Sequence, residues 1–380
     1  MKHVKFMNNR LLNLKSLMLN KNIDGLLISS VPNITYLTGF SNFSKDEREA
    51  FLLIVAQPQG LTHGTPGVLG YILTDGRYSE AVKKQVKDFE LIEISSKLSF
   101  GEAIKNLTQK NNIKRLGFEG HNISFLEHKR LSKYFNNIYH LSISNLRSVK
   151  TPDEISKIEK ACELGDKAFE YVLKKIKEGI SEKEIALEIE FFIKKQGANI
   201  SFPPIVAFGK NSSVPHHQAS DQRLTAKDQI VLLDFGVKLN NYCSDMTRTV
   251  FFGSANAEFK KMYQTVLEAQ QKAIQQLNNL TMKQLAIKAS EIDKIARDYI
   301  TTKGFPTIPH SLGHGIGLEV HESPRLSPLS KDILKENMVF SIEPGIYIPG
   351  FGGVRIEDLV VLGKSGPRFL TRCSRELIEL

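Results

Sequence analysis

Histidines gather around a glycine-rich turn late in the chain, in the sequence PHSLGHGIGLEVHESP at residues 309–324. This stretch holds His310, His314 and His321, three of the chain's ten histidines. Glycines on both sides of His314 allow the backbone to turn tightly and to approach a ligand closely. Imidazole binds divalent metals and carries protons near neutral pH. The stretch is therefore a candidate part of a metal or catalytic site.

Acidic residues that interrupt apolar runs form a second candidate group. Asp234 ends IVLLD, Glu343 ends VFSIE, Asp245 precedes MTRTVFF and Glu357 interrupts VRIEDLVVL. An unpaired charge in a buried strand is costly, so four such carboxylates need a common neutraliser. Two divalent cations would serve, because a carboxylate can bridge metals about 3.5–4 Å apart. Oxygen ligands with histidine favour Mn²⁺, Co²⁺ or Zn²⁺ over a metal that prefers thiolates.

Other motifs fit the chain less well. Asp234-Phe235-Gly236 spells the DFG of protein kinases, but no HRD-type loop precedes it. GHGIG lacks both the Lys-Ser/Thr of a phosphate-binding loop and the full dinucleotide fingerprint, and no HExxH zinc helix occurs. A metal site built from carboxylates and histidine remains the best interpretation.

Composition narrows the class of protein. A chain of 380 residues with 41% hydrophobic residues can form two domains with ordinary cores. Cys162, Cys243 and Cys373 are few and widely spaced, which favours a reducing compartment and a cytoplasmic location. The net charge of +10 comes from scattered lysines without interleaved aromatics, which argues against a nucleic-acid partner. No apolar stretch predicts a membrane span, and the first twenty residues favour an amphipathic helix over a signal peptide.

The first part of the chain alternates short apolar runs with helical patterns, which predicts a separate α/β domain over residues 1–147. The apolar runs are rich in Ile, Leu and Val and are bounded by turn residues, as expected of strands. Strands are predicted at 24–30, 50–56, 71–74 and 114–120, and helices at 79–89 and near 101–111.

The second part predicts a duplicated α+β unit over residues 148–380. Thr151-Pro152-Asp153-Glu154 has the pattern of a capped helix start, and the helix is expected to end at Gly179. Ser181 and Glu184 open a second helix that is expected to stop at Gly197. Further strands are predicted at 229–235, 246–252, 338–344 and 354–362, and helices at 256–278 and 282–303.

Five residues in their local settings resemble a known family. Asp234, Asp245, His314, Glu343 and Glu357 stand in LLDFG, CSDMTRT, GHGIGLEVHE, SIEPG and GVRIED. This order resembles the proline-specific metallopeptidases of the pita-bread fold, which comprise Xaa-Pro aminopeptidases and Xaa-Pro dipeptidases (prolidases) and are related to methionine aminopeptidases and creatinase. The segments PNITYLTGF and LTDGRYSEAV resemble the family's creatinase-type N-terminal domain.

The resemblance covers the whole chain and implies both its architecture and a ligand set. It implies a creatinase-like α/β domain over 1–147 and a pita-bread catalytic domain with pseudo-twofold duplication over 148–380. Two divalent ions are implied, with Mn²⁺ preferred and Co²⁺ or Zn²⁺ as alternatives, and a hydroxide between them as the nucleophile. By similarity, one metal is held by Asp234 and the other by His314 and Glu343, with Asp245 and Glu357 bridging.

Further roles follow from the same resemblance. His310 and His321 are expected to hold the substrate carbonyl and to stabilise the tetrahedral intermediate. Glu343 is expected also to pass a proton to the leaving amine. Arg355 matches an arginine beside the bridging glutamate, where a catalytic role and a plain salt bridge are both open.

A loop histidine is expected from the segment SVPHHQASD. His216 follows a proline as the family's histidine does, but its gap to Asp234 is one residue longer than in the family pattern. His217 is therefore the alternative, and His216 is preferred. Apolar residues nearby either wall a proline pocket or pack in the core: Phe202, Pro203, Ile205 and Phe208.

The implied reaction is removal of an N-terminal residue that precedes proline. An Xaa-Pro bond has no N–H and a restricted preceding residue, so general peptidases handle it poorly. The leading prediction is an Xaa-Pro aminopeptidase acting on peptides with proline second, and the alternative is a prolidase restricted to dipeptides. The large N-terminal domain argues against a methionine aminopeptidase, and the five retained ligands argue against a non-catalytic binding protein. The resemblance also implies a homodimer.

Overall fold

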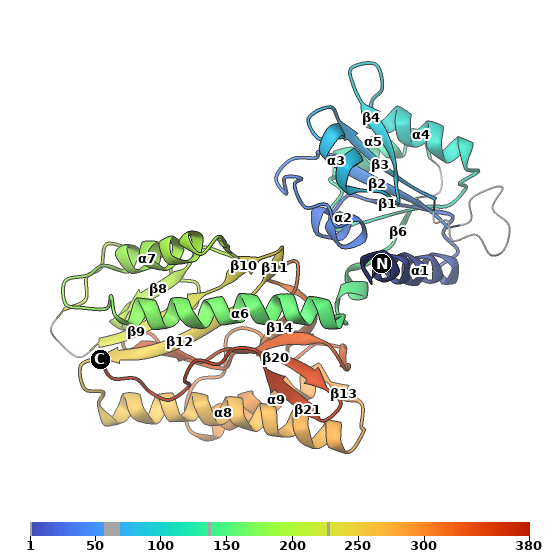
Figure 1. The fold of residues 1–380 in the computed structure, drawn as a ribbon. Helices are drawn as coiled ribbons and strands as arrows, with labels where there is room; N and C mark the ends of the chain where they lie inside the picture. Colours follow the sequence, from blue (N-terminus) through green and yellow to red (C-terminus); the bar gives the residue numbers. More distant parts are fainter. Residues whose placement is uncertain (1, 57–68, 136–137, 226–228) are drawn as a thin grey trace. The chain divides into compact units, whose positions relative to one another are not determined.

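The computed structural model describes residues 2–56, 69–135, 138–225 and 229–380. The chain divides into two compact units, Met1–Arg147 and Ser148–Leu380, each of which is described by itself. The N-terminal unit is drawn in blue to cyan in Figure 1 and the C-terminal unit in green to red. None of the helices within the described ranges is long and apolar enough to cross a membrane.

A six-stranded mixed sheet forms the centre of the N-terminal unit, with the order β4-β3-β2-β1-β5-β6. The pairs β1–β2 and β2–β3 are antiparallel, and the outer pairs are parallel. All residues of the two central strands β1 and β2 are buried, as their apolar runs predict. The strands are β1 (Gly25–Ile28), β2 (Ala50–Val55), β3 (Leu69–Asp75), β4 (Glu90–Ile94), β5 (Leu116–Phe118) and β6 (Ile138–His140).

Helices complete the α/β character of this unit. Capping boxes at Ser99 and Ser124 start α4 and α5. The helix predicted over 79–89 is shorter than expected, because Val86 is already extended. The helices are α1 (Lys2–Asn20), α2 (Val31–Thr38), α3 (Ser79–Gln85), α4 (Phe100–Lys110) and α5 (Phe125–Leu131), followed by the short 3₁₀ helix η1 (Ser144–Arg147).

The C-terminal unit begins with the helix pair α6 (Pro152–Leu173) and α7 (Glu182–Lys195). The predicted capping box is present, since Glu154 N donates to the Thr151 hydroxyl and Thr151 N donates to the Glu154 carboxylate. The expectation that the first helix runs to Gly179 is wrong. Lys174 N–H turns back to the carbonyls of the last turn, and Gly179 N–H donates to Leu224 O outside the helix.

A second helix pair follows, α8 (Ala257–Met282) and α9 (Ala289–Thr302). The predicted break at 278–282 lies too early. The chain leaves α8 at Met282 and then forms β13 (Ile287–Lys288), which pairs with β16 (Ile333–Leu334) before α9 begins. This pairing takes the backbone of residues 287–288 out of the helix.

Each helix pair packs on its own strands. One core joins α6 and α7 to the sheet β12-β9-β8, and another joins α8 and α9 mainly to the sheet β15-β14-β17-β20-β21. This repeated order of two helices and then strands agrees with the predicted duplication (Figure 1). The strands of these sheets are β8 (Ile205–Phe208), β9 (Gln229–Phe235), β12 (Met246–Phe252), β14 (Gly313–Gly315), β15 (Glu322–Leu326), β17 (Val339–Ile342), β20 (Asp358–Gly363) and β21 (Gly366–Phe369).

Short strands complete the unit. They are β7 (Asn199–Ile200), β10 (Val237–Leu239), β11 (Tyr242–Cys243), β18 (Gly345–Ile348) and β19 (Gly352–Arg355), with the 3₁₀ helix η2 (Gly209–Ser213) after β8. The strand predicted over 354–362 is split between β19 and β20. The break falls at Glu357, whose N–H leaves the ladder and donates to Thr247 O. The interruption lets this carboxylate point into the interior.

Candidate metal centre

Strand ends bring the predicted metal ligands to one region of the C-terminal unit. Asp234 lies near the end of β9 opposite Thr247, and Asp245 immediately precedes β12. On the other sheet Ile342 is paired with Asp358. Glu343 directly follows Ile342 and Glu357 directly precedes Asp358, so the two glutamates flank the same paired position. His314 stands on β14, which pairs with the same strand β17. The antiparallel registers therefore deliver each ligand from a different segment.

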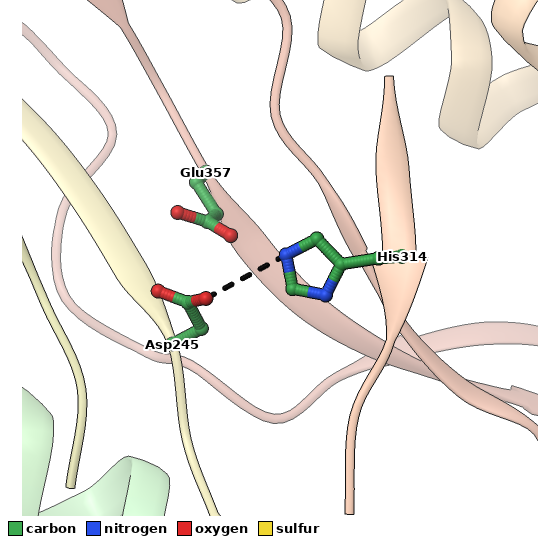
Figure 2. A group of neighbouring side chains, drawn as sticks. All are labelled: Asp245, His314 and Glu357. Carbon is green, nitrogen blue, oxygen red and sulfur yellow. Dashed lines mark ion pairs between the residues drawn. The ribbon is translucent and has the colours of Figure 1, made fainter. Parts of the chain in front are cut away.

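Three of these side chains form a tight group. One ligand atom each from Asp245, His314 and Glu357 lies within 4.8 Å of the others. Figure 2 shows the imidazole pointing between the two carboxylates. His314 Nε2 lies 3.6 Å from Asp245 Oδ2 and 3.3 Å from Glu343 Oε1, so four predicted ligands meet at this ring.

Asp234 stands beside this group and is held by an arginine. Arg355 Nη2 donates to Asp234 Oδ2 at 2.5 Å, and both side chains are almost wholly buried. Arg355 Nε also donates to the Thr247 hydroxyl, which in turn donates to Glu357 Oε2 at 2.7 Å. The predicted arginine therefore links the outer aspartate to the central glutamate.

Mutual repulsion makes the carboxylates a site for cations. Burial and the charges of Glu357, Asp234 and Glu343 raise the pKa of Asp245 well above its usual range. Burial and neighbouring carboxylates also raise the pKa of Glu357, and burial raises the pKa of Glu343 to about 7. Such a cluster must either hold protons or bind positive charge.

Orphaned oxygens test whether divalent ions fit. Asp234 Oδ1, Asp245 Oδ1 and Glu357 Oε1 are buried and have no hydrogen-bond partner among the described residues. His314 Nδ1 faces its acceptor Gly315 O at 3.2 Å, so as a donor there it leaves the Nε2 lone pair toward the carboxylates. A lone pair aimed at anionic oxygens is repulsive unless a cation lies between them. The donor set therefore fits oxygen-preferring divalent ions.

A chain of hydrogen bonds connects a second predicted histidine to this centre. His310 Nε2 lies 2.9 Å from the Tyr347 hydroxyl, which accepts from Arg355 Nη1 at 2.7 Å. Burial lowers the pKa of His310 to about 4 and raises the pKa of Tyr347 to about 12, so both groups are neutral at pH 7. Sequence reasoning missed Tyr347. Its only signal is strand-period spacing from Glu343 in SIEPGIYI.

The third histidine of the glycine-rich stretch lies over the ligand histidine. The ring centroids of His321 and His314 are 4.3 Å apart. His321 is exposed, whereas the following Glu322 forms a buried ion pair with Lys150, at 2.9 Å. The exposed ring is thus available to a substrate while its neighbour is fixed.

The two histidines of the SVPHHQASD segment have different surroundings. His217 Nε2 lies 2.8 Å from Glu182 Oε2, and its side chain is 16% exposed. His216 is exposed, and the carbonyl of the preceding Pro215 accepts from Arg355 Nη1 at 3.4 Å. Burial is the main influence on the pKa of Glu343 and raises it, and His216 is among the groups that act to lower it.

The four residues considered for a proline pocket differ in how deeply they are buried. Phe208 is 2% exposed and belongs to the core of α6, α7 and β9, in line with the packing alternative. Phe202 and Ile205 are half-buried, and Pro203 is exposed.

Buried supports that sequence reasoning missed surround the ligands. Arg248 is fully buried, donates to Glu357 O at 2.5 Å and pairs with Asp358 Oδ1 at 2.6 Å. Ser341 donates to Glu343 Oε1 at 3.0 Å. A charge inside the apolar run MTRTVFF was a signal for Arg248, but the serine has none.

Comparison with known proteins agrees with this arrangement. The model of "Metallopeptidase family M24" matches residues 156–364, and that of the "Creatinase/Prolidase N-terminal domain" matches residues 10–149. A protein named Xaa-Pro dipeptidase from Pyrococcus horikoshii is 37% identical over 98% of this chain and 99% of its own.

Solved structures are similar over nearly the whole chain. An Xaa-Pro dipeptidase from Bacillus anthracis superposes with a TM-score of 0.88 at 34% identity, covering 98% of this chain and 100% of that one. An X-Pro aminopeptidase from Thermotoga maritima gives a TM-score of 0.80 at 33% identity, covering 94% and 98%. The α/β N-terminal unit and the duplicated C-terminal unit are thus the creatinase-type and pita-bread domains that the sequence predicts. The chain belongs to metallopeptidase family M24.

Proposed function

We propose that the protein is an Xaa-Pro dipeptidase, which hydrolyses dipeptides with proline in the second position. The observation that supports this most is the 37% identity, over nearly both full lengths, to a relative named Xaa-Pro dipeptidase. The sequence alone favoured the aminopeptidase, and the named relatives favour the alternative instead. The cluster of Asp245, His314 and Glu357 supports a metal-dependent reaction in either case.

The metal ligands of this proposal are the five residues at the strand ends, and Mn²⁺ is the proposed ion. Asp234 would help to hold one divalent ion, His314 and Glu343 would hold a second, and Asp245 and Glu357 would contribute to both. When bound, these ions supply a Lewis acid for the scissile carbonyl and acidify a water to a nucleophile near neutral pH.

The other side chains bind and orient the substrate and move its proton. His321, exposed beside His314, donates to the substrate carbonyl, and His310 assists from its fixed position on Tyr347. Glu343 carries the proton from the attacking water to the leaving proline nitrogen through its carboxylate. His216, rather than His217, is the loop histidine of the site, because His217 is bound to Glu182.

Hydrolysis of Gly-Pro, Ala-Pro-Ala and Ala-Ala-Ala by the Mn²⁺-loaded protein tests the proposal. Cleavage of Gly-Pro with little action on either tripeptide is the expected result. Cleavage of Ala-Ala-Ala as readily as Gly-Pro, or no hydrolysis of any peptide by protein that contains metal, would contradict it.

The second candidate is an Xaa-Pro aminopeptidase, which the similarity to the Thermotoga maritima structure supports. Release of alanine from Ala-Pro-Ala, with Gly-Pro left intact, would favour it. A homodimer in the cytoplasm accompanies both candidates as a proposal. The location is supported by the three cysteines, none of which forms a disulfide.

A further inference from the structure

The buried carboxylate of Glu182 accepts hydrogen bonds at both oxygens from the SVPHHQASD segment and the residues just before it. Glu182, the first residue of α7, is 0% exposed. Its Oε1 accepts from Phe208 N at 2.7 Å and Asn211 Nδ2 at 2.8 Å. Its Oε2 accepts from His217 Nε2 at 2.8 Å and from Ser220 N and Oγ at 2.9 and 2.6 Å. Every one of these partners belongs to residues 208–220, the segment that carries His216.

The charge of Glu182 is maintained by these bonds. Burial alone would raise the pKa of Glu182, but the hydrogen bonds from Ser220, Asn211, His217 and Phe208 outweigh it and lower that pKa. The side chain is therefore ionised at neutral pH and accepts from all of its partners. A buried carboxylate without such partners would be costly, so the segment and the carboxylate hold each other in place.

His216 lies between two anchors. On one side the carbonyl of Pro215 accepts from Arg355, which also binds the predicted ligand Asp234. On the other side the ring of His217 donates to Glu182. With both neighbours fixed, the backbone of His216 has little freedom, while its own side chain stays exposed.

We propose that Glu182 is a positioning residue, which fixes His216 over the metal centre. It does so by holding the ring of His217 and the backbone at Phe208 and Ser220, on both sides of His216. This inference rests on the proposed function and deepens it. It assigns adjacent histidines opposite tasks, since His216 faces the substrate and His217 is an anchor. Pre-organising a group in this way lowers the barrier without any contact between Glu182 and the substrate.

The variant Glu182→Gln tests this with minimal change of shape. Each oxygen of Glu182 accepts one backbone N–H, from Phe208 or from Ser220. Whichever side the amide nitrogen takes, it faces a fixed donor, and one buried N–H loses its partner. We expect kcat for Gly-Pro to fall by roughly 10- to 100-fold, with metal content unchanged. Glu190→Gln is the matched control, since it removes the same charge from α7 at a residue paired with Lys194.

A double-mutant cycle separates positioning from general damage. If Glu182 acts through His216, Glu182→Gln should change kcat less than about twofold in a His216→Ala background, because nothing is left to position. Equal losses in both backgrounds would overturn the proposal, as would an unchanged kcat in Glu182→Gln alone.

His217→Ala and His217→Gln repeat the test without touching Glu182. The glutamine can still donate to the carboxylate and should recover most of the kcat lost in the alanine variant.

Hydrogen exchange gives a readout that does not depend on activity. In Glu182→Gln the amides of residues 208–220 should exchange faster, and those of the other described strands of the C-terminal unit should not. An inactive wild-type protein would contradict the proposed function, and the exchange result alone would then decide the anchoring. Unchanged exchange in 208–220, or acceleration across the whole unit, would overturn it.

Discussion

The hydroxyl of Tyr347 connects a neutral histidine to a buried arginine. It receives a hydrogen bond from Arg355 and lies within 2.9 Å of His310 Nε2. Because burial raises the pKa of Tyr347 to about 12, the group keeps its proton at neutral pH and can also donate to His310. The carbonyl of Ser311, 2.8 Å from His310 Nδ1, can only accept, so Nδ1 carries the proton of the neutral ring and Nε2 accepts from the Tyr347 hydroxyl.

Replacing Tyr347 by phenylalanine should remove the hydrogen bond that holds His310 at Nε2. The ring of His310 keeps its bond from Nδ1 to Ser311 O but loses its partner at Nε2, and the side chain of Arg355 keeps its bonds to Asp234, Thr247 and Pro215. We expect kcat to fall about tenfold, equivalent to about 1.4 kcal/mol, with bound metal unchanged. Steady-state kinetics with metal analysis checks this, and loss of metal would show that Tyr347 supports the ligands instead.

Replacing Glu357, the central glutamate of the cluster, should have a larger effect than replacing Tyr347. Glu357→Ala removes one ligand from the group of three and leaves the hydroxyl of Thr247 without its acceptor. We expect metal content and peptidase activity to be lost while the circular dichroism spectrum stays that of the wild type. Stoichiometric metal and retained activity in this variant would refute a bridging role for Glu357.

The stability effect of Glu182 should depend on pH. Its pKa is lowered in the folded protein, because the bonds from Ser220, Asn211, His217 and Phe208 outweigh burial. Its stabilising contribution is therefore complete above the unfolded pKa of about 4.3, and is lost as the pH falls through the lower folded value. Urea unfolding of wild type and Glu182→Gln from pH 7 to pH 3 should show the difference in unfolding free energy shrinking below about pH 4. A constant difference would contradict this.

At the scale of elements, α9 holds the chain on both sides of His310. Arg297 on α9 pairs with the buried Asp293 at 2.8 Å and donates to the carbonyls of Ile308 and His310. Asp293 accepts from Leu312 N at 3.1 Å. One turn of helix thereby fixes the segment that leads into β14 and the ligand His314.

Arg297→Ala should loosen this segment and leave Asp293 as an uncompensated buried charge. We expect the free energy of unfolding to fall by about 3 kcal/mol, since removal of one partner of a buried pair is strongly destabilising. Lys294→Ala is the control on the same helix, because its pair with Asp298 is exposed and is worth at most about 1 kcal/mol. Chemical denaturation of both variants compares them directly, and equal losses would contradict the role of Arg297.

The elements that the sequence predicted well are the long ones with a clear apolar pattern. The runs at 229–235 and 246–252 form β9 and β12 with the predicted bounds. Two-residue strands such as β13 and β16 were missed, because two residues carry no periodicity and their pairing depends on distant partners. Gly179 misled the helix end, since its positive φ marks a turn that follows several residues after α6.

The site shows the same division between local and distant causes. Carboxylates inside apolar runs could be found because a charge there needs an explanation. Thr247 and Glu182 could not, because threonine in a strand and glutamate at a helix start are ordinary. The roles of Thr247 and Glu182 depend on partners such as Glu357 and His217, which are far away in the sequence and are brought near only by the fold.

At the scale of the whole molecule, the predicted site residues all belong to one of the two compact units. All five predicted ligands and all four site histidines lie in Ser148–Leu380. The two matched family domains also meet near this boundary, the first ending at residue 149 and the second beginning at 156. Each unit has its own core, so each can unfold as a separate cooperative element.

Metal should therefore stabilise one unit and not the other. For ions present at about 100 times their dissociation constant, binding adds about 2.7 kcal/mol to the folded state. For a unit of this size that corresponds to a rise in Tm of about 5–10 °C. Calorimetry of the metal-free protein with added Mn²⁺ should show this rise in the transition of Ser148–Leu380 alone. Asp245→Asn should abolish it, because the amide cannot replace the charge that draws a cation to the cluster. An equal shift of both transitions, or the same shift in Asp245→Asn, would mean that the ions bind elsewhere.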